Sequence, residues 1–317
     1  MKSFNSIIGE RLAAYVELQR ALGFQFKRQV SGLRAFDQYL VQRGNPQPLT
    51  QELVIDFATA DPSSSAEYRA RRYNVVRRFC EYLATFDSET PALDPKALPW
   101  TNPRRPRRII TDEELSRLLH EARQISQVHP SRGVTLQAMI GLAASTGLRI
   151  GEVARLDRSD VDLKTGILLI RCTKFKKDRY VPTHPSTLSV LQSYAAVRDS
   201  TYPKCRDPAF FVTTLETRFS RNTLRQSFRE VAQRAELRGP TGKGLSFHSL
   251  RHRFAVKRLV AWYSAGIDVQ AMLPALATYM GHVHYSYTAY YLTATAELLG
   301  LAAERYNKWF DEAEVQP

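Results

Sequence analysis

The sequence predicts a mainly α-helical protein with one small antiparallel β-sheet, divided into two domains. Apolar residues recur at helical spacing over most of the 317 residues. A single β-branched and apolar run, Ile167–Cys172, interrupts this pattern, and Arg179–Pro182 follows it as a return strand. A segment rich in proline and arginine, residues 99–108, separates an N-terminal domain, residues 1–98, from the rest of the chain.

The N-terminal domain is predicted to be helical. Its apolar periodicity predicts four helices, at Ile7–Leu22, Val30–Val41, Leu53–Ala58 and Glu67–Phe86. The polar face of the fourth helix carries Arg69, Arg71, Arg72, Arg77 and Arg78. This face is either solvated or in contact with DNA phosphates, and the second interpretation requires that the rest of the chain be directed at DNA. Arg69 and Arg72 are then the candidate phosphate contacts.

The linker, residues 99–108, contains Arg104, Arg105, Arg107 and Arg108. Prolines at intervals of a few residues remove backbone donors and oppose continuous helix, so a linker is expected, and its arginines are candidate DNA contacts. Helix resumes at a capping box, Thr111–Glu114, inside the second domain, residues 109–317.

The second domain is predicted to be helical apart from the hairpin, whose turn carries Lys174, Lys176 and Lys177. Its last helix, Ala296–Phe310, has apolar residues at helical spacing. Two interpretations of this tail helix stay open: it packs on its own domain, or it docks into a neighbouring protomer, which we favour.

Composition favours a cytoplasmic protein that binds a polyanion. The formal net charge is +14, of which residues 1–100 contribute +2 and residues 101–317 contribute +12. Nucleic acid is favoured over a membrane surface, because no strongly amphipathic basic anchor and no lipidation signal is seen. No uncharged stretch reaches membrane-spanning length. Glu10 and Arg11 interrupt any secretory pattern. The three cysteines are far apart without a CxxC pair, so neither a disulfide framework nor a zinc site is expected.

Arg149 lies inside an apolar run, in the segment Thr146–Glu152. A charge in such surroundings is costly unless it is paired or meets an anionic ligand. Glu152 shares its helical face and could be the partner, so a structural ion pair and an anion site are equally good interpretations of this segment alone.

Two later segments bring together imidazoles, a guanidinium and phenols. His248 and Arg251 are three residues apart, so on a helix both project to one side and could face one phosphate. His282 is followed by Tyr285, Tyr287, Tyr290 and Tyr291. Aromatic residues at this spacing are more often core than catalytic, and a metal pair at His282 and His284 is not expected because such side chains diverge on a helix.

Together these segments resemble the tyrosine recombinase (phage integrase) family. Thr146–Glu152 resembles its first arginine box, TGLRxGE, and the hairpin TKxKKDRxVP resembles the one that carries its catalytic lysine. His248–His252 matches HxLRH, and Gly281-His282, followed nine residues later by Tyr291, matches its GH…Y box. The order and spacing agree from residue 146 to 291. The N-terminal helices fit the family's core-binding (SAM-like) domain by length and helicity alone.

The resemblance implies site-specific DNA recombination by two successive transesterifications. The Tyr291 phenol attacks phosphorus, the 5′-hydroxyl leaves, and a 3′-phosphotyrosine forms. The covalent intermediate conserves the bond energy, so no metal or other cofactor is required. Arg149 and Arg251 would bind the phosphate oxygens and stabilise the developing charge.

The remaining roles also follow from the resemblance. Lys174 would protonate the leaving oxygen, His248 would manage the proton of the nucleophile, and His282 would donate a hydrogen bond to the phosphate. Glu152 would hold the geometry. The partner would be double-stranded DNA, on which the family usually assembles as a tetramer at two sites.

Three alternatives stay open at this stage. Tyr290, next to Tyr291, could be the nucleophile. A type IB topoisomerase shares the arrangement of functional groups and the mechanism. A DNA-binding factor with a degenerate site belongs to a different class, although every expected catalytic position is occupied here.

Overall fold

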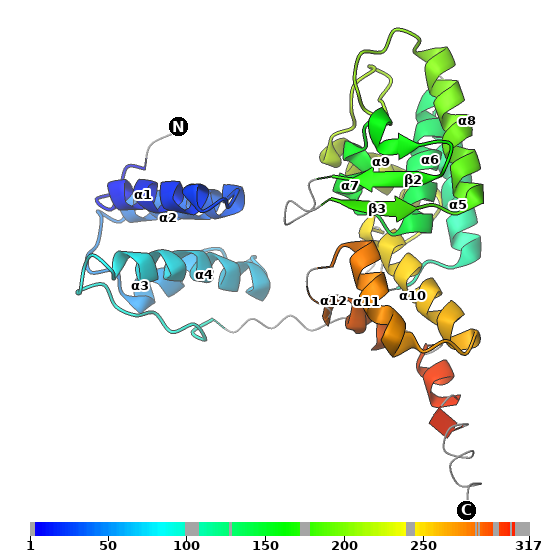
Figure 1. Cartoon of the computed structure of the whole chain (residues 1–317). Coiled ribbons are helices and arrows are strands. Elements are labelled where there is room, and N and C mark those ends of the chain that lie inside the picture. The colour runs from blue at the N-terminus through cyan, green and yellow to red at the C-terminus, as the bar shows by residue number, and fades with distance from the viewer. Residues whose placement is uncertain are drawn as a thin grey trace, which may run out of the picture. The chain divides into compact units, whose positions relative to one another are not determined.

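The computed structural model describes residues 4–98, 108–126, 129–171, 178–238, 245–282, 284, 286–293, 298–304 and 306–307. The chain forms two compact units, Met1–Arg104 and Arg105–Pro317. The predicted fold class, mainly α with a small antiparallel sheet, is confirmed (Figure 1).

The N-terminal unit consists of four helices around one apolar core. They are α1 (Gly9–Ala21), α2 (Lys27–Gln42), α3 (Gln51–Thr59) and α4 (Ala66–Leu83). Leu33, Phe36, Phe57 and Phe79 are buried between them. Thr50 and Ser65 cap α3 and α4 by accepting hydrogen bonds from backbone N–H groups of the first turn.

The arginines of α4 have intramolecular contacts in this unit. Arg72 stacks over the ring of Phe57 at 4.0 Å, and Arg69 donates to the carbonyl of Pro62. Arg71 pairs with Glu67, and Arg77 pairs with Glu81, at helical spacing. The positive charge of this face is therefore partly neutralised by glutamates of the same helix.

The second unit combines helices with a three-stranded sheet (Figure 1). Its first helices are α5 (Asp112–Arg123), α6 (Pro130–Thr146) and α7 (Ile150–Arg155), followed by the short 3₁₀ helix η1 (Arg158–Asp160). The strands β1 (Val161–Asp162), β2 (Ile167–Ile170) and β3 (Arg179–Pro182) pair in that order, all antiparallel. Leu168 and Val181 are opposite each other, and both belong to the core that α6 fills.

The sheet differs from the sequence prediction in two places. β2 ends at Ile170, whereas the apolar pattern predicted a strand to Cys172, which lies outside the described residues. Arg171 leaves the strand and pairs with the buried carboxylate of Asp160. The two-residue strand β1 was not predicted, because it is too short to show an alternating pattern.

The remaining helices surround the sheet and form the C-terminal part of the unit. They are α8 (Pro185–Thr201), α9 (Arg221–Arg234), α10 (His248–Ser264), α11 (Val269–Met280) and α12 (Ser286–Ala289), with the 3₁₀ helix η2 (Tyr290–Thr293). A separate core joins α10, α11 and η2, and it includes Tyr291 and Leu298. Residues 298–304 are helical, and Leu298 is completely buried, so the start of the tail packs on its own domain.

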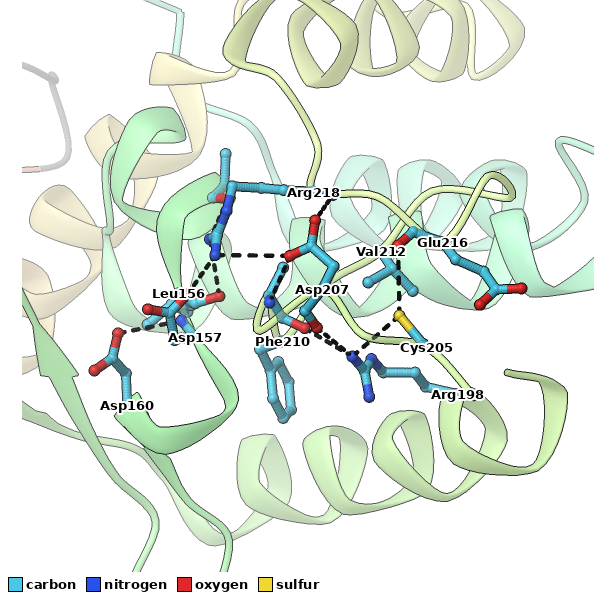
Figure 2. A network of polar contacts seen from close by, with 12 residues as sticks. Leu156, Asp157, Asp160, Arg198, Cys205, Asp207, Phe210, Val212, Glu216 and Arg218 are labelled. Carbon is cyan, nitrogen blue, oxygen red and sulfur yellow. Dashed lines mark hydrogen bonds and ion pairs between the residues drawn. The ribbon is translucent and has the colours of Figure 1, made fainter. Parts of the chain in front are cut away.

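A polar network fixes the connection between α8 and α9 to the end of α7 (Figure 2). The Arg218 guanidinium pairs with Asp157 and donates to the carbonyls of Ala154 and Leu156, both at 3.4 Å. The Asp207 carboxylate accepts from the backbone N–H of Arg218 at 2.8 Å. The connection has little regular structure. Its Arg218 nevertheless holds the C-terminal end of α7, the helix that begins directly after Arg149.

No helix among the described residues combines the length and the apolar character needed to cross a bilayer.

Candidate active site

Three arginines from separate elements meet at the C-terminal end of α11. Arg179 of β3 donates from Nε to the carbonyl of Tyr279 at 2.8 Å. Arg251 of α10 donates from Nη2 to the carbonyl of Met280, and Arg149 donates from Nη2 to the carbonyl of Gly281, both at 2.7 Å. The last carbonyls of a helix lack partners within it and carry its negative end. The carbonyl groups at the C-terminal end of α11 thus bring three guanidinium groups close together.

Two glycines make this convergence possible. Gly281 has φ +66, and a Cβ there would lie 2.9 Å from Nη1 of Arg179. Gly147 also has φ +66; its carbonyl accepts from Nη1 of Arg251 at 2.8 Å, and a Cβ would lie 2.5 Å from the ring of Phe254. A left-handed conformation combined with such close neighbours favours glycine strongly.

Glu152 is the shared carboxylate of the site and is only 4% exposed. It accepts from the backbone N–H and from Nη1 of Arg149, at 2.9 and 2.8 Å, and from both terminal nitrogens of Arg179, at 3.2 and 3.0 Å. Burial alone would raise its pKa, but the hydrogen bonds and positive charges of Arg179 and Arg149 outweigh burial and lower the pKa to about 2. The carboxylate is therefore ionised at neutral pH.

Arg251 is the most deeply buried of the three arginines, at 1% exposed. Burial, followed by the charge of Arg149, lowers its pKa to about 10, so it is still a cation at neutral pH. A buried charge of this kind needs partners, and backbone carbonyls supply them without neutralising it. The site therefore keeps a net positive charge that an anion could balance.

His282 connects Arg251 to α12. Its Nε2 lies 2.7 Å from Nη2 of Arg251, and its Nδ1 lies 2.7 Å from Oγ1 of Thr288, which is completely buried. A guanidinium can only donate, so Nε2 accepts and Nδ1 carries the proton. Burial and then the charge of Arg251 lower the pKa of His282 to about 3. The imidazole is therefore neutral in the free protein.

Tyr291 lies directly against this imidazole. Its ring is stacked on that of His282, with 6.3 Å between centroids and 18° between planes, and it is 3% exposed. It also contacts His252 edge to face at 5.2 Å. Tyr290 is half-buried, and its ring lies farther from His252, at 6.5 Å. The Tyr291 ring therefore contacts both His252 and His282.

The structure brings together five of the residues singled out from the sequence: Arg149, Glu152, Arg251, His282 and Tyr291. His248 begins α10, is exposed, and contacts His252 edge to face at 4.6 Å. The positions Lys174, Lys176 and Lys177, and likewise Arg104, Arg105 and Arg107, lie outside the described residues. Arg108 is described; it donates to the carbonyl of Arg238 and pairs with Glu114.

Three residues for which the sequence predicted no role also lie at the site. Arg179 contacts Glu152, Thr288 contacts His282, and His252 contacts Tyr291. Arg179 lies in the hairpin motif TKxKKDRxVP and His252 lies in HxLRH. Their places in these motifs were the signal that could have indicated a role at the site. In the described part of the chain, no cluster of three or more histidine, cysteine or acidic residues could hold a metal ion.

The lowered pKa of His282 predicts a loss of stability in mild acid. The unfolded chain binds a proton at this residue near the ordinary value of 6.5, whereas the folded protein does so only near 3. The unfolded state thus holds more protons in this window, and the free energy of unfolding falls as pH drops below 6.5. We expect a loss on the order of 1 kcal/mol between pH 7.5 and 5.5, measurable by thermal or urea unfolding.

The variant His282→Asn should lack most of this pH dependence. His184→Asn is the matched control, because His184 is exposed and caps α8, a role that asparagine also fills. A slope that is the same in the wild type and in His282→Asn would contradict the assignment of a neutral, buried imidazole.

Comparison with known proteins identifies relatives over nearly the whole chain. The model described as the phage integrase family matches residues 108–297. The chain is 45% identical to y4rE of Sinorhizobium fredii, whose name describes an integrase/recombinase, over 96% of this chain and 97% of that protein. It is 28% identical to tyrosine recombinase XerD of Ralstonia nicotianae, over 84% and 82% of the two chains. The crystal structure of the XerH site-specific recombinase bound to palindromic difH substrate has the same fold, with a TM-score of 0.67 at 19% identity over 88% and 79%.

Proposed function

This chain belongs to the phage integrase family of tyrosine recombinases, and we propose that its recombination reaction proceeds through a covalent bond between DNA and Tyr291. The protein is thus an enzyme of site-specific DNA recombination. The observation that carries the proposal is the stacking of the Tyr291 ring on His282, which is bonded to the buried Arg251.

The phosphate would be bound by Arg149 and Arg251. Both carry fixed positive charge, and Arg149 is 33% exposed, so an oxygen of a DNA phosphate can approach it. A planar guanidinium can hold two phosphate oxygens and stabilise the negative charge that develops at phosphorus. Their backbone partners orient them before DNA arrives, and such prior orientation is worth more in a buried site than in water.

Tyr291 would attack phosphorus through its phenolic oxygen while the 5′-oxygen leaves. The new bond is a phosphotyrosine, and the 5′-hydroxyl of a second strand would later reverse the step. Lys174 would protonate the leaving oxygen, and His248, which is exposed at the start of α10, would accept the phenol proton. His282 would donate to the phosphate from Nε2 once Arg251 has released this nitrogen and it has gained a proton, by protonation of the ring or by a change of tautomer.

The partner would be double-stranded DNA in the cytoplasm, with a tetramer assembled on two sites. Structural neighbours support the DNA partner, since the lambda integrase (residues 75–356) was solved bound to DNA. The basic residues of the linker, of the hairpin turn and of α4 would contact the phosphate backbone. They would fix the register on the duplex without reading its sequence. The N-terminal unit would serve as the core-binding domain.

The test is the capture of a covalent adduct on the protein's own DNA target. The purified chain is incubated with genomic DNA of its source, denatured, and digested, and the DNA that stays on protein is sequenced. A nicked duplex built on that sequence should then trap an adduct whose peptide carries the modification at Tyr291. An adduct on another residue would refute the proposal.

Two other outcomes would favour the alternative functions. Efficient relaxation of a supercoiled plasmid that lacks the mapped site would favour a topoisomerase. Tight binding to the mapped site without any adduct would favour a DNA-binding factor. Dependence of strand exchange on two such sites is the result expected here.

A further inference from the structure

Arg179 stands out because all three nitrogens of its guanidinium donate hydrogen bonds inside the protein. It is the first residue of β3, and its side chain is 11% exposed. Nε donates to the carbonyl of Tyr279, and the two terminal nitrogens donate to the two oxygens of Glu152 at 3.2 and 3.0 Å. This is the fork geometry in which arginine binds a carboxylate most strongly. Three of the five N–H donors of this side chain are thus used inside the protein, and the side chain is largely buried.

The partners of Arg179 are the groups that position Arg149. The Arg149 guanidinium donates to Glu152 and to the carbonyl of Gly281. Glu152 is held by the fork of Arg179, and the Cα of Gly281 lies so close to Arg179 that a Cβ would come within 2.9 Å of its Nη1. Arg179 therefore holds one partner of Arg149 directly and lies close to the other.

Charge balance gives a second consequence. Glu152 is a single negative charge between Arg149 and Arg179, with Arg251 also within electrostatic reach. Because the fork of Arg179 compensates that charge, the cluster of Arg149, Arg179 and Glu152 keeps a net charge of +1. Without Arg179, the carboxylate would neutralise Arg149, and the field at an adjacent phosphate would fall accordingly.

We propose that Arg179 is a positioning residue of the recombination reaction, which holds Glu152 and the end of α11 so that Arg149 meets the scissile phosphate in a fixed place with its charge uncompensated. This rests on the proposed function above. β3 also follows directly on the segment that contains Lys174, so Arg179 ties the base of that hairpin to the site.

The decisive experiment is a charge-balance rescue. Single-turnover cleavage of the nicked duplex is measured at saturating DNA for Arg179→Gln and for Arg179→Gln with Glu152→Gln. The single variant should cleave about 10- to 100-fold more slowly than the wild type, with DNA affinity little changed, as for groups that orient a functional ligand. The double variant should recover at least about fivefold, because Arg149 regains an uncompensated charge. Arg179→Lys should be intermediate, since it keeps the charge without the fork.

Arg218→Gln is the matched control. Arg218 has the same kind of contacts, with the carboxylates of Asp157 and Asp207 and with carbonyls at a helix end, in a network separate from that of Arg149 and Arg179 (Figure 2). Its cleavage rate per folded molecule should stay within about twofold of the wild type. Melting curves give the folded fraction. If Arg179→Gln is too unstable, Arg179→Met, which also removes the charge, carries the same comparison with and without Glu152→Gln.

The outcomes separate the two proposals. A wild-type chain that forms no adduct refutes the proposed function. If the wild type forms the adduct and Arg179→Gln cleaves at the wild-type rate, only the role of Arg179 is refuted. A double variant that is as slow as the single one, or slower, also refutes it, because a purely structural role would make the two losses add.

Discussion

Replacing Tyr291 with phenylalanine should abolish the covalent adduct, whereas Tyr290→Phe should preserve it. Phenylalanine lacks the oxygen that attacks phosphorus, so cleavage should fall by roughly 10⁴-fold or more, the usual cost of removing a nucleophile. The ring of Tyr291 is buried against His252 and His282, and phenylalanine fills the same space. Folding and DNA affinity should therefore be close to those of the wild type.

The measurement is single-turnover adduct formation on the nicked duplex, resolved on a denaturing gel, with melting temperature and DNA affinity measured in parallel. Tyr290→Phe is the matched control, because it removes a phenolic oxygen from the neighbouring residue, which is half-buried. Adduct formation by Tyr291→Phe together with its loss in Tyr290→Phe would reverse the assignment. Loss in both would point to a proton acceptor shared by the two rings.

Much of the site could be predicted because its chemistry is carried by local motifs. Arg149 and Glu152 are three residues apart, which is helical contact distance, and the structure pairs them at 2.8 Å. Gly147 and Gly281 follow helices and have positive φ, as helix-ending glycines commonly do. In each of these cases the structural feature depends on residues close in the sequence, so the local sequence pattern is sufficient to predict it.

Arg179 was missed because its partners are distant in sequence. Glu152 precedes it by 27 residues and Tyr279 follows it by 100. Periodicity assigns Arg179 to a strand, and a basic residue near a hairpin turn is usually solvated, so no local rule indicates a buried ion pair. Thr288 was missed for a similar reason. Thr288 lies in α12 and contacts His282, which follows the end of α11, and apolar periodicity does not predict contacts between separate elements.

Element boundaries were harder to predict than element types. Each of the four helices predicted in the N-terminal unit is present, but the fourth helix ends at Leu83 and not at Phe86. The turn that follows is closed by hydrogen bonds from the N–H groups of Thr85 and Phe86 to carbonyls three residues back. Both conformations bury similar apolar groups, so the apolar pattern cannot distinguish a last helical turn from a tighter one.

Arg251→Lys should have the second largest effect, a loss of roughly a thousandfold in cleavage rate. The guanidinium donates to three acceptors at once: the carbonyls of Gly147 and Met280, and Nε2 of His282. A lysine ammonium is a point charge on a flexible stem and cannot occupy these three positions together with a phosphate oxygen. Single-turnover cleavage at saturating DNA measures the effect, and Lys257→Arg, on an exposed turn of the same helix, is the control.

His282 provides an independent readout of the same substitution. After burial, the charge of Arg251 is the largest cause that lowers the pKa of this imidazole. A lysine that withdraws from Nε2 should let the pKa rise from about 3 toward the ordinary value of 6.5, which NMR titration of the imidazole can follow. A slow variant whose imidazole still titrates as in the wild type would mean that Arg251 acts on the phosphate alone. Slow cleavage with a raised pKa would mean that Arg251 sets both the charge of the site and the protonation state of its histidine.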